Sequence, residues 1–327
     1  MSFNVVAACP HTIVCASDRR LVDLLSGTIR TNRSTKMTVF GCADAHGVTV
    51  YNGIGLDDDG MTPSDWLLEL EEKRKLFNCR LPDVLDGTSA DLETRLRKLR
   101  AKYGPKKARH TFVFAVWREG ASMIYGVSNY ERVDEDKQSV EGSEKVTLST
   151  LPPEPKDDAR VVTTGAPSRF ADRRAIKEAL KAGTLNRVRA LSVKAVRDAA
   201  YGKGKGIGTV GASAQWAQLG ANRDEVWFGL DVVGGAVAQE TPNLINIAAE
   251  VPLGGSWRAR IGGPGTLVKD TYAGGEKVAH YNPMKKAAVF PEPLCGICGS
   301  PWPASHRSCE VCLYEGQHKG KRHRQVP

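Results

Sequence analysis

The sequence has no long apolar run. No stretch of it approaches the roughly 20 consecutive apolar residues that a helix needs to span a bilayer, so no membrane segment is expected. The N-terminus, Met-Ser-Phe-Asn-Val-Val, also lacks the positively charged segment that precedes the apolar part of a signal peptide. Together these absences predict a cytoplasmic protein with no membrane partner.

Two other patterns are missing. The glycine-rich run Gly202-Lys-Gly-Lys-Gly-Ile-Gly208 follows an expected helix and matches neither a phosphate-binding loop nor a dinucleotide-binding turn, so we interpret it as a flexible connection. No internal repeat occurs at the period of a solenoid. Nucleotide-binding and repeat architectures are therefore not indicated.

The composition is otherwise that of a globular protein with a basic excess. Apolar residues make up 41% and charged residues 25% of the chain, and the formal net charge is +9. Residues 285–327 hold seven Lys/Arg against three Asp/Glu, so they contribute +4. Such an excess can indicate a nucleic acid or an acidic partner. The simpler interpretation, which we favour at this point, is a solvated tail.

The order of expected elements predicts an α+β fold. Thr62, Pro63 and Asp65 form the start signal of a first helix, with Thr62 as N-cap and Asp65 as the capping-box acid. Further helices are expected at 89–103, 172–182 and 186–201. Strands are expected at 3–8, 12–16, 37–42, 48–51, 111–116, 121–125, 160–163, 207–216 and 225–232. Strands, two helices, strands, two helices and strands suggest two sheets packed face to face with helices outside.

The chain divides into three parts by pattern. Residues 2–239 hold the regular elements and are expected to form the main domain. Residues 240–290 are rich in Gly and Pro without a clear helix, so they are expected to form an irregular extension. Residues 291–327 contain a cysteine cluster and the basic tail, and are expected to form a separate small module.

Residues 2–20, SFNVVAACPHTIVCASDRR, resemble the opening of proteasome β-subunits and their bacterial relatives, which are N-terminal-nucleophile (Ntn) hydrolases. The resemblance implies that Ser2 is the nucleophile after removal of Met1. It also implies that Asp18 and Arg20 correspond to the Asp-x-Arg motif at the end of the second strand, and that Lys36 is the lysine that follows. Gly53, just before the first helix, matches the glycine whose amide stabilises the oxyanion.

The resemblance continues more weakly to about residue 235. Thr163-Thr164-Gly165 resembles the family's Gly-Ser-Gly turn, which implies that the Thr164 hydroxyl supports the site. Asp198-Ala-Ala-Tyr-Gly202 resembles the Asp-x-x-Ser-Gly helix end, which makes Asp198 a site residue, although Tyr201 stands where the family has serine. The family further implies a four-layer αββα sandwich, a homo-oligomer, and a peptide or protein substrate.

The chemistry of these residue types suits amide hydrolysis. A serine hydroxyl needs a base to accept its proton, and the α-amino group of a freed Ser2, with a pKa of about 8, can serve as that base. A Lys36 ammonium beside it would favour ionisation of the hydroxyl, and Asp18 would keep that ammonium in place. The Gly53 amide would stabilise the tetrahedral intermediate.

A second interpretation, which belongs to a different class of function, stays open. Each residue taken alone has an ordinary explanation: a serine behind a retained Met1, a strand-end ion pair between Asp18 and Arg20, or a surface lysine. The loss of the family's serine at Tyr201 also weakens the match. The alternative is a catalytically inactive scaffold with the Ntn fold, whose C-terminal module and basic tail bind a protein or a nucleic acid.

The C-terminal module has the spacing of a metal site. Two C-x-x-C pairs are separated by ten residues, and they comprise Cys295, Cys298, Cys309 and Cys312. Four thiolates complete a tetrahedral shell around Zn²⁺ with no open position, so the pattern predicts a structural zinc ribbon. The other four cysteines, at 9, 15, 42 and 79, are scattered and are expected to be mostly buried small apolar residues.

Overall fold

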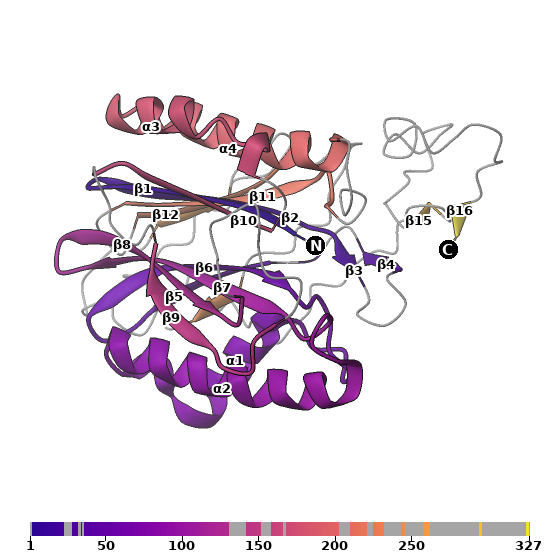
Figure 1. Cartoon of the computed structure of the whole chain (residues 1–327). Coiled ribbons are helices and arrows are strands. Elements are labelled where there is room, and N and C mark those ends of the chain that lie inside the picture. The colour runs from indigo at the N-terminus through magenta and orange to yellow at the C-terminus, as the bar shows by residue number, and fades with distance from the viewer. Residues whose placement is uncertain are drawn as a thin grey trace, which may run out of the picture.

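The computed structural model describes residues 2–22, 28–31, 34, 36–130, 142–151, 158–165, 168–202 and 210–220, together with strands at 225–231, 243–245, 258–261, 294–295 and 325–326. The described residues form a mixed α/β structure with two large sheets and four α-helices (Figure 1). Within these residues, no helix combines the length and the apolar character that a membrane span requires.

The first sheet carries the N-terminus, and its strand order is β10-β1-β2-β11-β12-β14. Its strands are β1 (Phe3–Cys9), β2 (Thr12–Asp18), β10 (Arg160–Gly165), β11 (Ala214–Gly220), β12 (Glu225–Asp231) and β14 (Arg258–Ile261). The strands β1 and β2 form a tight hairpin in which every strand residue is buried, whereas Pro10 and His11 of the turn are exposed. A strand that is buried along its whole length is covered on both faces of the sheet.

The second sheet has the order β13-β5-β6-β7-β8-β9. Its strands are β5 (Met37–Gly41), β6 (Ala45–Gly53), β7 (His110–Arg118), β8 (Ala121–Ser128), β9 (Thr147–Thr150) and β13 (Asn243–Ile245). A short hairpin of β3 (Leu21–Val22) and β4 (Ile29–Thr31) leads from the first sheet toward β5. A separate antiparallel pair joins β15 (Leu294–Cys295) to β16 (Gln325–Val326).

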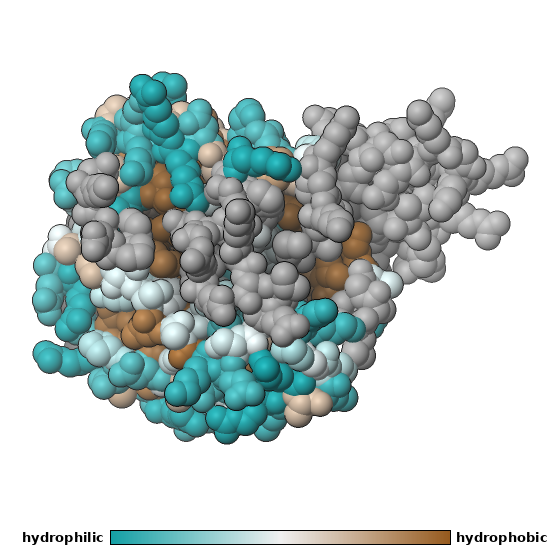
Figure 2. Space-filling view, viewed as in Figure 1, coloured by the Kyte–Doolittle hydropathy of each residue, from teal (hydrophilic) through white to brown (hydrophobic). Residues whose placement is uncertain are grey.

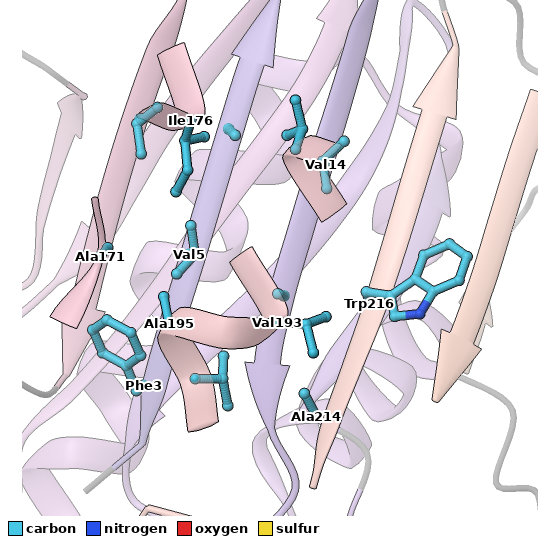
Figure 3. Packing of buried hydrophobic residues seen from close by; sticks show 14 of the residues in the cluster. Phe3, Val5, Val14, Ala171, Ile176, Val193, Ala195, Ala214 and Trp216 are labelled. Carbon is cyan, nitrogen blue, oxygen red and sulfur yellow. The ribbon is translucent and has the colours of Figure 1, made fainter. Parts of the chain in front are cut away.

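Three apolar clusters hold the layers together. The inner cluster joins the facing sides of the two sheets, and residues such as Ile13 and Cys15 of β2 pack there with Met37 and Val39 of β5. On the outer side of the first sheet lie α3 (Arg173–Lys181) and α4 (Leu185–Tyr201) (Figures 1 and 3). On the outer side of the second sheet lie α1 (Pro63–Arg74) and α2 (Leu81–Tyr103) (Figure 1).

The first residues of α1 and α2 show which local sequence signals set the start of a helix. The predicted capping box of α1 is confirmed, because Thr62 Oγ1 accepts from the Asp65 N–H at 3.2 Å and Asp65 Oδ2 accepts from the Thr62 N–H at 2.7 Å. The predicted start of α2 at Ser89 is wrong, since the helix begins at Leu81. Pro82 fits the first turn of a helix, where no N–H is needed. Gly87 lies inside α2 because the Leu76 side chain occupies the place of a Cβ, at 2.5 Å.

The C-terminal third contributes strands to both sheets. β13 and β14 lie within residues 240–290, where an irregular extension was expected, and they pair in parallel with β5 and β12. Each has only three or four residues, too few for an alternating pattern to be visible in the sequence. In the expected zinc module, the structure describes only the backbone of β15 and β16. The side chains of all four clustered cysteines lie outside the described residues.

Candidate functional site

Ser2, Lys36 and Asp18 meet in a single buried cluster. The Lys36 Nζ donates to Ser2 Oγ at 2.8 Å and to Asp18 Oδ1 at 2.8 Å. The three residues are 5%, 1% and 0% exposed, respectively. Hydrogen bonds therefore link a hydroxyl, an ammonium group and a carboxylate in that order. They do so in an interior where electrostatic interactions are stronger than in water.

The hairpin of β1 and β2 explains how residues 2 and 18 come together. Antiparallel pairing puts Asn4 opposite Ser17, so the start of β1 and the end of β2 lie side by side. The Phe3 N–H consequently donates to Asp18 Oδ2 at 2.9 Å. The spacing of sixteen residues between Ser2 and Asp18 is thus set by two seven-residue strands and a two-residue turn.

Besides the hydrogen bond from the Lys36 side chain, the Asp18 carboxylate accepts three hydrogen bonds from backbone N–H groups. The donors are the N–H groups of Phe3, Arg20 and Gly211, at 2.9, 2.9 and 3.2 Å. A buried carboxylate is tolerated where its lone pairs are satisfied and a cation is present. Asp18 is therefore held in a fixed orientation from three segments of the chain.

Burial controls the charge of the lysine. Removal from water lowers the pKa of Lys36 below that of an ordinary lysine, and the Asp18 carboxylate opposes that shift. The nearby Arg20 charge lowers the Lys36 pKa further. Arg20 thus contributes to the site through its backbone N–H, which binds Asp18, and through its positive charge.

Lys36 is also held through its backbone. In the amide orientation that satisfies its surroundings, Gln215 of β11 accepts from the N–H groups of Lys36 and Met37, at 2.6 and 3.0 Å. Gln215 belongs to the first sheet, whereas Lys36 immediately precedes β5 of the second. This link fixes the lysine at the point where the two sheets meet.

Two of the glycines with positive φ end strands, and one of them, Gly165, lies against Ser2. Gly165 ends β10 with φ +96°, and a Cβ there would lie 1.8 Å from the carbonyl oxygen of Ser2. Gly53 ends β6 with φ +110°, and a Cβ there would lie 2.1 Å from the carbonyl oxygen of Arg109. In both cases the backbone conformation and the close approach require glycine.

Asn4 connects β1 to the end of β6. Its Nδ2 donates to the carbonyl oxygen of Tyr51 at 3.0 Å and to Thr164 Oγ1 at 3.1 Å, while its Oδ1 accepts from Ser17 Oγ at 2.6 Å. Tyr51 lies two residues before Gly53, so this side chain ties the strand of Ser2 to the strand that Gly53 ends. Within the part of the chain that the structure describes, Thr164 contacts Asn4 and has no hydrogen bond to Ser2.

Asp198 lies apart from the cluster. Its carboxylate forms an ion pair with Lys194, one turn earlier on the outer side of α4, and its side chain is 44% exposed. Among the described residues, no hydrogen bond connects Asp198 with Ser2, Asp18 or Lys36. The structure therefore does not bring this predicted site residue to the other members.

Some contacts at the site were not expected from the sequence. Asn4, Gln215 and Gly211 all bind site residues or their strands, but each comes from a place where one polar residue or glycine looks ordinary. An asparagine in an otherwise apolar buried strand was the one available sign, because such a residue needs hydrogen-bond partners. Among the described residues, no group of three or more His, Cys, Asp or Glu side chains could hold a metal ion.

No protein-family model and no curated protein matches the chain. Structural similarity is found to Anbu (ancestral β-subunit) from Yersinia bercovieri, with 10% identity, a TM-score of 0.47, and coverage of 69% of this chain and 86% of that one. It is also found to an Anbu (Gly-1) mutant from Hyphomicrobium sp. strain MC1, with 11% identity, a TM-score of 0.39, and coverage of 66% and 82%. A third structure, the helical assembly of the Anbu complex from Pseudomonas aeruginosa, has 14% identity, a TM-score of 0.40, and coverage of 67% and 80%.

Proposed function

We propose that this chain is a proteasome-like Ntn hydrolase with a four-layer αββα sandwich, in which Ser2 cleaves amide bonds of peptides or proteins after Met1 is removed. The observation that carries the proposal is the buried chain of contacts from Ser2 Oγ through Lys36 Nζ to Asp18 Oδ1, each 2.8 Å long. Such a chain supplies a nucleophile, a cation that favours its ionisation, and an acid that positions the cation.

The proposed reaction begins with attack of Ser2 Oγ on the carbonyl carbon. The hydroxyl proton passes to the α-amino group of Ser2, and the Lys36 ammonium stabilises the oxygen that loses it. The tetrahedral intermediate then loses its amine, which takes up the proton from the α-amino group. Water hydrolyses the resulting ester and regenerates Ser2. The Gly53 N–H is the proposed donor to the oxyanion, a role typically worth about 3 kcal/mol.

The remaining parts of the proposal concern the C-terminal module and assembly. We retain a structural Zn²⁺ bound by Cys295, Cys298, Cys309 and Cys312, because the spacing of the two C-x-x-C pairs suits a closed tetrahedral site. We also propose a homo-oligomer, as the family resemblance implies, and a cytoplasmic location. Metal analysis of the purified chain tests the bound Zn²⁺, and native mass measurement tests the homo-oligomer.

A catalytically inactive Ntn-fold scaffold is the second candidate function. The observation in its favour is the exposed ion pair of Asp198 with Lys194, which leaves Asp198 out of the proposed site. In this case the zinc module and the basic tail would bind a protein or a nucleic acid, and no covalent chemistry would occur at Ser2.

Reaction with a β-lactone distinguishes the two functions. Intact mass first establishes that Met1 has been removed. The hydrolase then gains one acyl group, which peptide mapping locates on Ser2 and which is absent from Ser2→Ala. Asp198→Ala serves as a matched control that removes a carboxylate outside the cluster, and it is expected to label normally. Protein that lacks Met1 and remains unlabelled would exclude the hydrolase and favour the scaffold.

A further inference from the structure

Besides the basic tail, a large net positive charge lies in one helical layer. Residues 168–202, which we call the α3–α4 layer, contain nine Lys/Arg and three Asp/Glu, a net charge of +6. Residues 63–103, the α1–α2 layer on the opposite side of the molecule, contain nine Lys/Arg and eight Asp/Glu, a net charge of +1. Each layer covers one six-stranded sheet. Covering a sheet therefore does not by itself require the higher net charge of the α3–α4 layer.

The basic side chains of the α3–α4 layer reach solvent. Arg174 and Lys194 have side chains that are 91% and 65% exposed, and Arg187 is also exposed. Arg187 and Lys194 are seven residues apart, two helical turns, so they lie on the same face of α4 about 10 Å apart. Hydrophilic residues cover this layer in the space-filling view (Figure 2). Two ion pairs, Arg174–Glu178 and Lys194–Asp198, are already included in the net +6.

The same face offers little for an apolar partner. Among the described residues, the one large apolar side chain that is exposed is Leu148, which lies on β9 in the other sheet. Protein interfaces have an apolar core of aromatic and aliphatic residues inside a polar rim, and the α3–α4 layer does not present one. Six of its nine basic residues are arginines, whose planar guanidinium groups match phosphate oxygens in geometry.

From these observations we infer that the α3–α4 layer binds the phosphate backbone of a nucleic acid. The surface is charged, exposed and poor in apolar groups, which is the combination that backbone binding uses. The inference does not use the hydrolase proposal: among the described residues, no hydrogen bond or ion pair joins Arg174, Arg187 or Lys194 to the cluster of Ser2, Lys36 and Asp18.

The aromatic residues Phe170, in the layer, and Trp216, beneath it on β11, argue for backbone contact without base stacking. Trp216, beneath α4, is buried, and the Arg189 guanidinium covers its ring at 4.4 Å. The Arg169 guanidinium lies over Phe170 at 5.2 Å. Because single-strand binding relies on exposed aromatic rings that stack on bases, duplex is the expected ligand, with no sequence preference.

Fluorescence anisotropy with a labelled DNA duplex tests the inference on the full chain. Arg174, Arg187 and Lys194 are changed together to Gln, and affinity is measured between about 50 and 200 mM salt. If all three side chains bind phosphates, the slope of log K against log salt becomes shallower by about 2.7, since each neutralised phosphate contributes about 0.9 to it. Affinity at the lowest salt is expected to fall at least about tenfold.

A matched variant in the other layer is the control. Arg97, Lys98 and Lys102 of α2 are changed together to Gln, which removes the same charge and, as in the first variant, breaks two ion pairs. This variant is expected to bind duplex with an unchanged salt slope, and both variants should retain the thermal midpoint of the parent. An equal loss of affinity in both variants would mean attraction by net charge alone and would overturn the inference.

Three further results would also overturn the inference. One is unchanged duplex binding by the α3–α4 variant together with loss of binding when Lys319, Lys321 and Arg322 of the tail are changed to Gln. Another is stronger binding to poly-glutamate than to duplex, which would indicate an acidic protein partner. A third is much tighter binding to single-stranded DNA than to duplex, which would require stacking on bases.

Discussion

Two of the lysine–aspartate pairs among the described residues have the same chemistry in very different surroundings. Lys36 and Asp18 have side chains that are 2% and 0% exposed, between the two sheets. Lys194 and Asp198 have side chains that are 65% and 44% exposed, on the outer side of α4. Asp18, Lys36 and Asp198 stand in motifs that the sequence offers without any indication of burial. Burial, rather than residue type, therefore decides which pair can organise a site.

The difference has a physical basis in hydration. A surface pair exchanges good hydration for a screened attraction and contributes about 0.2–1 kcal/mol. A buried pair has lost its water, so each partner depends on the other and on the hydrogen bonds around it. Asp18 has its three backbone donors for this reason, and the lowered pKa of Lys36 shows that its charge is still costly to bury.

The largest effect is expected for Asp18→Ala. The substitution leaves the Lys36 ammonium buried without its counter-charge and leaves three N–H groups without an acceptor. The free energy of unfolding should fall by about 3–5 kcal/mol, and β-lactone labelling of Ser2 should be lost. Denaturant unfolding and intact mass measure the two outcomes. Unchanged stability would show that the buried pair behaves like the exposed one.

Gly165→Ala should be the next most damaging change. The new methyl group would meet the Ser2 carbonyl oxygen at 1.8 Å, and φ of +96° disfavours alanine in addition. The expected loss is about 3 kcal/mol, with slower labelling because Ser2 must move. Gly183→Ala is the control, since Gly183 has φ of +65° with open space around it and should lose about 1 kcal/mol. Equal losses would mean that backbone strain alone matters at Gly165.

Asn4→Ala should cost about 2 kcal/mol. It leaves the Tyr51 carbonyl and the Ser17 hydroxyl without their buried partner. Because Asn4 ties β1 to the end of β6, labelling of the folded protein should also slow, whereas its dependence on pH should not change. Thermal unfolding and labelling rates measured on the same sample separate the two effects. A stability loss with a normal labelling rate would assign Asn4 to folding alone.

The labelling rate should have a bell-shaped pH dependence. It should rise as the α-amino group of Ser2 loses its proton, near pH 8. It should fall again, about tenfold per pH unit, as Lys36 loses its proton, below the ordinary lysine value of about 10.4 because burial lowers its pKa. Stability should change in the opposite direction over that alkaline limb. The unfolded chain still holds the lysine proton there and the folded one does not, so this group adds stability as pH rises. A rate that stays constant to pH 10 would contradict the role of the Lys36 charge.

The smallest effect is expected for Asp198→Ala. The exposed pair with Lys194 should contribute at most about 0.5 kcal/mol, and labelling at Ser2 should be unchanged. Chemical denaturation and the labelling rate provide the measurements. A labelling defect of tenfold or more would return Asp198 to the site and remove the contrast between the two pairs.

Much of the candidate site could be predicted because it depends on local geometry. A hairpin of known strand lengths brings residues 2 and 18 together, and the Thr62 capping box fixes the start of α1. The contacts of Asn4 and Gln215 could not be predicted, because they depend on how two sheets face each other. The position of Asp198 away from the cluster was not expected, because a motif at the end of a helix does not reveal which side of the helix meets the core. The start of α2 was missed because Pro82 suits both a loop and a first helical turn.

The parallel pairing of β13 with β5, and of β14 with β12, ties the completion of the fold to the order of synthesis. On the ribosome, β5 emerges with Lys36 at its start about two hundred residues before its neighbour Asn243–Ile245 has been made. The second sheet cannot acquire its last strand until residue 245 has left the exit tunnel, and the first sheet cannot until residue 261 has left it. A nascent chain that stalls earlier would expose the lysine-bearing strand as an open edge, where an unrelated extended segment could pair with it.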